Sequence, residues 1–183
     1  MMSFRLACNI AAIVFPFLLG GLFFSNITVG QNISTYEQYI VPPDSGVMFF
    51  GSSISADRDV LLIGSMNNRT DSNYSDPRSS AGAAYLYTKN SGQWSGMTKI
   101  VASDRTVGNF FGVAVDVSHF NNQYQLIIAA DGGDYQTAQG SGKLYFFKQI
   151  GNSWKEEQKF STSDANTNDH VGSEICRCIW WYS

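Results

Sequence analysis

Two pairs of closely spaced aspartates are the residues whose type and spacing could do chemistry. Asp131 and Asp134 enclose two glycines in a long polar stretch, and Asp57 and Asp59 are separated by one residue. Paired carboxyl groups can serve as general acid and base, and their oxygens are also ligands that Ca²⁺ prefers. Aspartates this close together more often accept hydrogen bonds from the backbone of a turn, so a solvated turn is the favoured interpretation. We keep all four as candidates for a binding surface and predict no catalytic residue and no metal ligand.

Three further motifs do not meet the requirements of their chemistry. The stretch from Gly140 to Lys143 is reminiscent of a phosphate-binding loop, but Leu144 stands where a hydroxyl would bind magnesium, and a strand pattern follows instead of a helix. His119 and His170 are the only histidines, too few for a zinc site without cysteines nearby. The nucleophile motif G-x-S-x-G does not occur. The sequence therefore predicts no cofactor.

Four asparagines lie in the N-x-S/T pattern that accepts N-linked glycans in secreted eukaryotic proteins. They are Asn26, Asn32, Asn68 and Asn73. The last two fall within one polar stretch between predicted strands, where a surface loop would tolerate a glycan. All four are candidate glycosylation sites.

The N-terminal residues have the pattern of a targeting segment. Arg5 precedes an apolar run over residues 6–24, which is interrupted only by Asn9, Pro16 and two glycines. A secretory signal peptide has this pattern, and the run is also nearly long enough for a single retained membrane anchor. In both alternatives the positive end stays in the cytoplasm and the following chain is delivered to the other side. We expect residues 1–30 to be a signal peptide or a signal-anchor helix, and the protein to be secreted or displayed on the extracellular face of the membrane.

Composition narrows the fold class and the kinds of partner. The 183 residues carry a formal net charge of -3, and only 15% are charged whereas 14% are aromatic. A chain without a basic patch does not suit a nucleic acid, so we expect no nucleic-acid partner. Many aromatic residues and 17 glycines with few charges are typical of an all-β protein.

A step of about 60 residues relates two successive parts of the chain, and such a fixed step is the signature of a repeat architecture. The landmarks that recur at this step are Phe50-Gly51 with Phe111-Gly112 and then Gly172, Tyr85 with Tyr145, Trp94 with Trp154, and Ser103-Asp104 with Ser163-Asp164. We expect the glycines to allow a close approach of the backbone and the two phenylalanines to fill the wedge between neighbouring units.

Each repeat contains four short runs of apolar, β-branched or aromatic residues separated by turn residues. The runs are residues 52–56, 60–65, 83–88 and 94–102 in the first repeat, and 113–118, 125–130, 143–148 and 154–161 in the second. No segment after residue 30 shows a sustained period of 3.6 residues, so helices are not expected. The sequence predicts two units of four antiparallel strands.

The recurring letters resemble the FG-GAP repeats, which are best known from the heads of integrin α-chains. The resemblance is carried by Phe50-Gly51, the run Val60-Leu-Leu-Ile-Gly64, the run Gly82-Ala-Ala-Tyr-Leu-Tyr87, Trp94, and the second Phe111-Gly112. It implies a partial β-propeller with four-stranded antiparallel blades of about 60 residues. Many members hold calcium between the first two strands of a blade, but here that connection lacks the spaced carboxylates and the glycine of such a loop, so no calcium site is expected.

The resemblance also implies domain boundaries and a function. After the signal or anchor over residues 1–30, which the apolar run indicates, the boundaries are 36–50 for the outer strand of a preceding blade, 51–110 and 111–170 for two blades, and 171–183 for the start of a third blade followed by an aberrant tail. The implied function is a non-enzymatic extracellular module that binds a protein or glycan ligand through loops on one rim. Two alternatives are a propeller-scaffold hydrolase whose active residues lie in missing blades, and a purely structural repeat segment. Because known propellers have about four to eight blades, we expect the sequence to be a fragment of a larger protein.

Overall fold

The computed structural model describes residues 38–42 and 49–173. The predicted signal segment, with Asn26 and Asn32, and residues 174–183 of the predicted third blade and tail lie outside the described residues. The chain divides into a unit Met1–Tyr39 and a unit Ile40–Ser183. Of the first unit only residues 38 and 39 are described, and neither belongs to a strand. All eight strands described below belong to the second unit.

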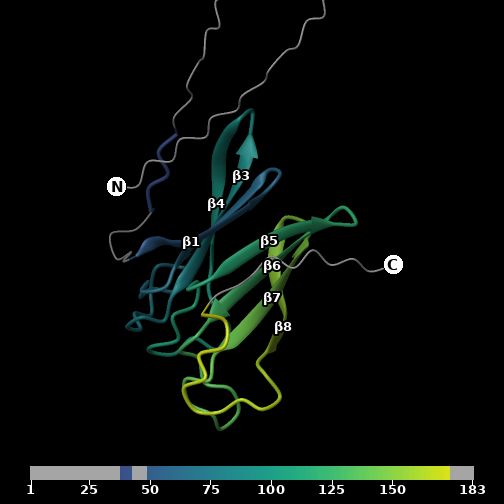
Figure 1. Cartoon of the computed structure of the whole chain (residues 1–183). Helices are drawn as coiled ribbons and strands as arrows, with labels where there is room; N and C mark the ends of the chain where they lie inside the picture. The colour runs from purple at the N-terminus through teal and green to yellow at the C-terminus, as the bar shows by residue number, and fades with distance from the viewer. Residues whose placement is uncertain (1–37, 43–48, 174–183) are drawn as a thin grey trace, which may run out of the picture. The chain divides into compact units, whose positions relative to one another are not determined.

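Eight strands form two four-stranded antiparallel sheets in the described part of the chain (Figure 1). Sheet 1 contains β1 (Phe50–Asp57), β2 (Val60–Ser65), β3 (Ala83–Asn90) and β4 (Gln93–Ile100). Sheet 2 contains β5 (Val115–Phe120), β6 (Gln123–Ala130), β7 (Lys143–Ile150) and β8 (Ser153–Phe160). Within each sheet the strands lie side by side in sequence order. The predicted all-β class and the predicted pair of four-stranded antiparallel units are thereby confirmed.

The strands differ from the sequence-based expectation mainly at their ends. β5 begins two residues later than expected, because the amide of Val113 donates a 3.0 Å hydrogen bond to the carbonyl of Phe110 and closes a turn. On the N-terminal side, residues 38–42 form no strand, and Phe50 begins β1 instead of ending an earlier strand. The expected outer strand over 36–50 is therefore absent from the residues that are described, while residues 36, 37 and 43–48 lie outside them.

Two-residue turns join strands at one end of each sheet, which we call the hairpin end. Ser91 and Gly92 both have positive φ angles, 51° and 84°, and so do Asn121 and Asn122, with 49° and 58°. Two consecutive positive φ angles are characteristic of a type I′ turn, whose twist matches that of the paired strands. The connections at the opposite end are longer, and we call that side the long-loop end. It consists of residues 66–82, 101–114, 131–142 and 161–173.

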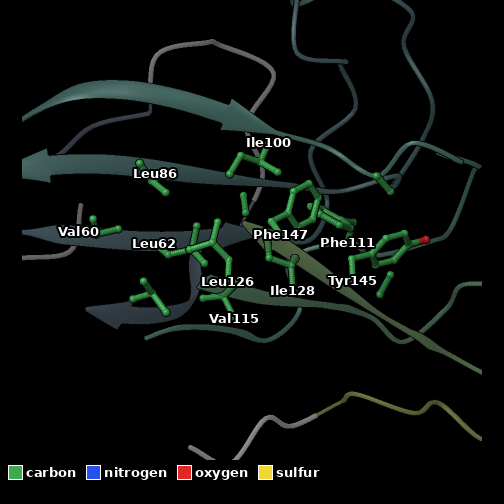
Figure 2. Packing of buried hydrophobic residues seen from close by; sticks show 14 residues of the cluster. Val60, Leu62, Leu86, Ile100, Phe111, Val115, Leu126, Ile128, Tyr145 and Phe147 are labelled. Carbon is green, nitrogen blue, oxygen red and sulfur yellow. The ribbon is translucent and has the colours of Figure 1, made fainter. Parts of the chain in front are cut away.

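The main hydrophobic core lies where the two sheets pack against each other (Figure 2). Sheet 1 contributes Val60, Leu62, Ala84, Leu86 and Ile100, and sheet 2 contributes Val115, Val117, Leu126, Ile128, Ala130, Tyr145 and Phe147. Phe111, from the linker between the sheets, is fully buried in this core with its ring centroid 5.1 Å from that of Tyr145. Phe111 thus lies between the two sheets. Burying one large apolar side chain stabilises a fold by about 1.5–3 kcal/mol, so this core is the principal connection between the sheets.

The same ring contact occurs in sheet 1 one repeat earlier. The ring of Phe50 meets Tyr85 edge to face at 5.5 Å between centroids, as Phe111 meets Tyr145. Tyr85 belongs to a second apolar cluster on the other face of sheet 1, to which Ile40 and Met97 also contribute. The two sheets therefore repeat a contact between side chains as well as a strand order.

The recurring glycine marks a close approach of backbone between the sheets. Gly51, Gly112 and Gly172 have φ angles of 86°, 90° and 91°, a region that other residues rarely adopt. A Cβ atom on Gly112 would collide with the backbone carbonyl of Ala83 at the start of β3. Gly112 is needed both for its backbone angle and for the space in front of it.

Candidate functional site at the long-loop end

Backbone hydrogen bonds join the four longer connections in two pairs at the long-loop end. The amide of Gly108 donates to the carbonyl of Ser79, and the amide of Phe110 donates to Ser80, both at 2.9 Å. One repeat later, the amide of Val171 donates to the carbonyl of Ser141 at 2.8 Å. Each segment that leaves a sheet is thus fastened to the long loop of that same sheet. This scaffold holds the side chains described next.

Asp104 lies at the centre of a charged cluster that joins the linker to sheet 2. Its carboxylate accepts a 2.7 Å hydrogen bond from the hydroxyl of Tyr145 and a 2.8 Å hydrogen bond from Nζ of Lys143, both on β7. Nζ of Lys159, on β8, lies 3.1 Å from Oδ2 of the same carboxylate. We call these four residues the Asp104 cluster. The preceding Ser103 adds two hydrogen bonds to the carboxylate of Glu156, of 3.0 Å from its amide and 2.7 Å from its hydroxyl.

The electrostatics of the Asp104 cluster favour a permanent ion pair over proton exchange. Partial burial by itself would raise the pKa of the Asp104 carboxyl, but hydrogen bonds from Lys143, Tyr145 and Lys159 outweigh it and lower the pKa to about 2. Burial, followed by the hydrogen bond to Asp104, raises the pKa of the Tyr145 hydroxyl far above its usual range. At neutral pH the carboxyl is therefore charged and the phenol neutral, which suits a structural contact and not general acid or base catalysis.

A second cluster fastens the long loop of sheet 1 to the linker. The side chain of Arg105 is only 6% exposed, and its Nη2 donates a 2.9 Å hydrogen bond to the carbonyl of Arg69. Oδ2 of Asp76 lies 3.4 Å from Nη1 of Arg105 and 3.0 Å from Nη2 of Arg78. Burial lowers the pKa of the Arg105 guanidinium, and the charge of Asp76 opposes that shift. The guanidinium remains charged, since a free arginine has a pKa above about 12, and its bonds order residues 69–78.

The structure separates the four candidate aspartates into two places. Asp57 and Asp59 lie at the hairpin end, where Asp57 ends β1 and Asp59 belongs to the two-residue turn before β2. Oδ2 of Asp57 accepts a 2.9 Å hydrogen bond from the amide of His119, so this carboxylate links β1 to β5. Asp131 and Asp134 lie at the long-loop end, after β6. The two pairs are at opposite ends of the strands and do not form one site.

Asp134 takes part in the internal structure of its loop, and Asp131 contacts the segment that follows β8. Oδ1 of Asp134 accepts a 2.8 Å hydrogen bond from the amide of Gly140, which closes the loop between β6 and β7. The carbonyl of Asp131 lies 3.1 Å from Nδ1 of His170. The Asp134 contact is that of a hydrogen-bonded turn.

The two described glycosylation candidates have opposite environments. Asn68 is fully buried, and its Nδ2 donates a 2.9 Å hydrogen bond to the hydroxyl of Tyr85. A glycan is attached through that nitrogen, so a glycan on Asn68 is incompatible with this fold. Asn73 is exposed on a turn in which Oδ1 of Asp71 accepts hydrogen bonds from the amides of Asn73 and Ser75, at 2.9 and 2.8 Å. Of the two, only Asn73 is placed to carry a glycan.

Exposed hydrophobic side chains occur at both ends of the sheets. Tyr74 and Val107 lie at the long-loop end, and Val107 is 70% exposed. Phe120 and Ile150 lie at the hairpin end, and Ile150 is 53% exposed. The ring of Tyr74 has the ammonium of Lys99 4.8 Å from its centroid. An exposed aromatic ring beside a cation is a contact surface that both proteins and sugars can use.

Residues that sequence reasoning missed are mainly the partners of Asp104. The recurrence of Ser103-Asp104 as Ser163-Asp164 was visible, but it did not indicate which side chains the aspartate meets. No sequence motif marked Lys143 or Lys159 as a partner of this aspartate. The burial of Asn68 was hidden in the same way, because a three-residue sequon carries no information about tertiary contacts.

Comparisons with known proteins identify no family for this chain. No family model matches the chain, and no curated protein matches it either. Among the described residues there is no group of three or more His, Cys, Asp or Glu side chains that could hold a metal ion. Nor does the described part of the chain contain a helix long and apolar enough to cross a membrane.

Proposed function

We propose that the chain is part of a β-propeller built from FG-GAP-like repeats, and that it serves as a non-enzymatic extracellular or cell-surface module that binds a protein or a glycan through the long-loop end. The observation that carries the proposal is the repetition of one sheet, with the same strand order, the same Phe–Tyr ring contact and the same glycine conformation. Repeated sheets whose longer loops gather at one end are a common scaffold for binding surfaces.

The rigidity of the long-loop end supports a binding role. The Asp104 cluster and the bonds of Arg105 fix the linker and the loop of sheet 1, while Tyr74 in that loop and Val107 in the linker remain exposed. Exposed apolar and aromatic side chains on a fixed base lose little conformational entropy when a ligand binds. The surface is therefore suited to recognise a partner without a large rearrangement.

The mutual hydrogen bond of the two titratable groups with the most strongly shifted pKa values supports a non-enzymatic function. Asp104 and Tyr145 have the most strongly shifted pKa values of any carboxyl and hydroxyl group described, and they bond to each other. The same observation favours the second candidate, a structural repeat segment, because these groups connect parts of the chain. A propeller hydrolase would need its active residues in blades outside this sequence.

Binding is tested with the full chain secreted from eukaryotic cells and immobilised on a sensor surface. The variants are Val107→Ser at the long-loop end and, as a matched control at the hairpin end, Ile150→Ser; both remove an exposed aliphatic side chain. Glycans and extracellular protein domains that bind the unchanged chain should bind Val107→Ser at least ten-fold more weakly, and Ile150→Ser equally well. Equal loss in both variants, or turnover of a glycoside or phosphodiester substrate, would contradict the proposal. A chain that binds nothing would favour the structural alternative.

A further inference from the structure

Asn73 and Tyr74 are adjacent, exposed residues in one hydrogen-bonded turn at the long-loop end. The carboxylate of Asp71 accepts hydrogen bonds from the amide of Asn73 and from the amide and hydroxyl of Ser75, at 2.9, 2.8 and 3.0 Å. The amide of Tyr74 donates to the carbonyl of Asp71 at 3.1 Å, and the amide of Asp71 donates to the carbonyl of Ser75 at 2.9 Å. An aspartate that accepts hydrogen bonds from the following backbone in this way fixes the shape of a turn.

The loop that carries this turn is held at both of its ends. The guanidinium of Arg105 donates a 2.9 Å hydrogen bond to the carbonyl of Arg69 and a 3.3 Å hydrogen bond to the carbonyl of Asp76. The amide of Arg78 donates to the carbonyl of Arg69 at 2.7 Å, which closes the loop. A group attached to the turn therefore stays close to its neighbours in the loop.

Tyr74 presents an aromatic surface that a ligand can use. The ammonium of Lys99 lies over its ring, 4.8 Å from the centroid, and Nζ of the same lysine donates a 2.6 Å hydrogen bond to Oγ1 of Thr70. Tyr74 is nevertheless 44% exposed. Tyrosine is among the residues that contribute most to binding energy at interfaces, particularly when its ring is held in one orientation. Tyr74 is therefore the aromatic contact of the long-loop end of sheet 1.

The sequon Asn73-Tyr74-Ser75 contains both the glycan acceptor and this aromatic contact. The Cα atoms of consecutive residues are about 3.8 Å apart, and an N-linked glycan is bulky. A glycan on Nδ2 of Asn73 therefore fills the solvent beside Tyr74. The bonds that close the turn use the backbone amide of Asn73 and not its side chain, so the fold of the turn is compatible with this glycan.

We propose that a glycan on Asn73 covers Tyr74 and thereby controls which ligands reach this part of the long-loop end. A ligand that contacts Tyr74 is excluded from the glycosylated chain and binds the glycan-free chain. The control of binding rests on the proposed function, because it requires that the long-loop end binds a ligand. The covering of Tyr74 does not depend on it.

Hydroxyl-radical labelling tests whether the glycan covers Tyr74. The unchanged full chain and Asn73→Gln are secreted from eukaryotic cells, and mass spectrometry measures both the glycan on residue 73 and the labelling of Tyr74. Labelling of Tyr74 should be at least about two-fold higher in Asn73→Gln, because the glycan that shields the ring is gone. Labelling of Phe120 at the hairpin end, which is 49% exposed, should stay the same. Asn152→Gln, an exposed asparagine outside any sequon, is the matched control and should leave Tyr74 unchanged.

Equal labelling of Tyr74 in the unchanged chain and in Asn73→Gln would overturn the proposal. So would a secreted chain without a glycan on Asn73.

Binding at a sensor surface tests whether the glycan controls access. In a panel of glycans and extracellular protein domains, some members should bind Asn73→Gln at least about three-fold more tightly than the unchanged chain, and Tyr74→Ala in the Asn73→Gln background should abolish this gain. Equal binding to the unchanged chain and to Asn73→Gln, or a gain that persists without Tyr74, would overturn the control of access. If no member of the panel binds, the proposed function fails, whereas the labelling experiment still decides whether the glycan covers Tyr74.

Discussion

The carboxylate of Asp104 accepts a 2.7 Å hydrogen bond from the buried hydroxyl of Tyr145, which lies 41 residues further along the chain. The bond joins the linker that leaves sheet 1 to the third strand of sheet 2. Lys143 and Lys159 approach the same carboxylate, so one side chain in a connecting segment holds three groups of the following sheet. The position of one sheet relative to the next therefore depends on a polar contact as well as on the hydrophobic core.

Replacing Asp104 with asparagine should destabilise the fold. Asp104→Asn leaves the buried ammonium of Lys143 without its anionic partner, at a cost of about 1–3 kcal/mol in the free energy of unfolding. Urea denaturation of the purified chain measures this change. Asp164→Asn is the matched control, because Asp164 holds the equivalent position one repeat later and is exposed. A loss of stability that is the same in both variants would contradict the role assigned to the Asp104 cluster.

The free energy of unfolding should fall as the pH is lowered, over a pH range set by the pKa of Asp104. Its pKa is lowered from 3.8 to about 2 in the folded state, so its contribution is complete above about pH 4 and is lost as the pH falls through 2. At about 1.36 kcal/mol per pKa unit the upper limit is about 2.5 kcal/mol, and screening of a side chain that is one-third exposed reduces this to about 1–2 kcal/mol. The measurement is urea unfolding at pH 5, 4, 3 and 2. The difference between the unchanged chain and Asp104→Asn should shrink over this range, and a constant difference would refute the assignment.

Substitutions of Gly112 and Gly92 distinguish the two requirements for a glycine at position 112, which are the positive φ angle and the close approach of the backbone. Gly112→Ala should cost more than about 2 kcal/mol, because the methyl group meets the carbonyl of Ala83 in addition to the strained φ angle of 90°. Gly92 has a φ angle of 84° but open space in front of it, so Gly92→Ala should cost only about 1 kcal/mol. Thermal denaturation of both variants tests this order. Equal costs would mean that the close approach between the sheets contributes nothing.

Expression in a secreting eukaryotic cell tests the two described sequons. Asn73→Gln should remove one glycan, seen on a gel as a mobility shift after peptide N-glycosidase treatment that is smaller by one glycan than that of the unchanged chain. Asn68→Gln should leave the glycan count unchanged and lower the stability by about 1–3 kcal/mol, since it disturbs a buried amide that bonds to Tyr85. Retention of a glycan at Asn68 in the folded, secreted chain would contradict the structure.

The two sheets could be predicted from the sequence because the residue patterns that specify their strands and turns are local and occur twice. Apolar runs such as Val60–Ile63 and turn residues such as Ser91-Gly92 specify strands and hairpins within a few residues, and the fixed step of the repeat shows how many strands belong to a unit. The contacts and burial of individual polar residues were much less predictable. Asp104 meets Tyr145 only through the packing of one sheet on the next, and Asn68 is buried only because Tyr85 reaches it from β3. Such contacts depend on tertiary geometry, which short motifs do not encode.

Asp104 is synthesised before any partner of its carboxylate. Lys143 and Tyr145 follow 39 and 41 residues later, which at about 5–20 residues per second is a delay of roughly 2–8 s. Throughout that interval sheet 1 is complete in sequence, yet Leu62 and Leu86 have nothing to cover them. Sheet 1 therefore exposes an apolar face until sheet 2 has been translated. A pause in translation within residues 113–145 would lengthen the time in which two nascent chains can aggregate through this face.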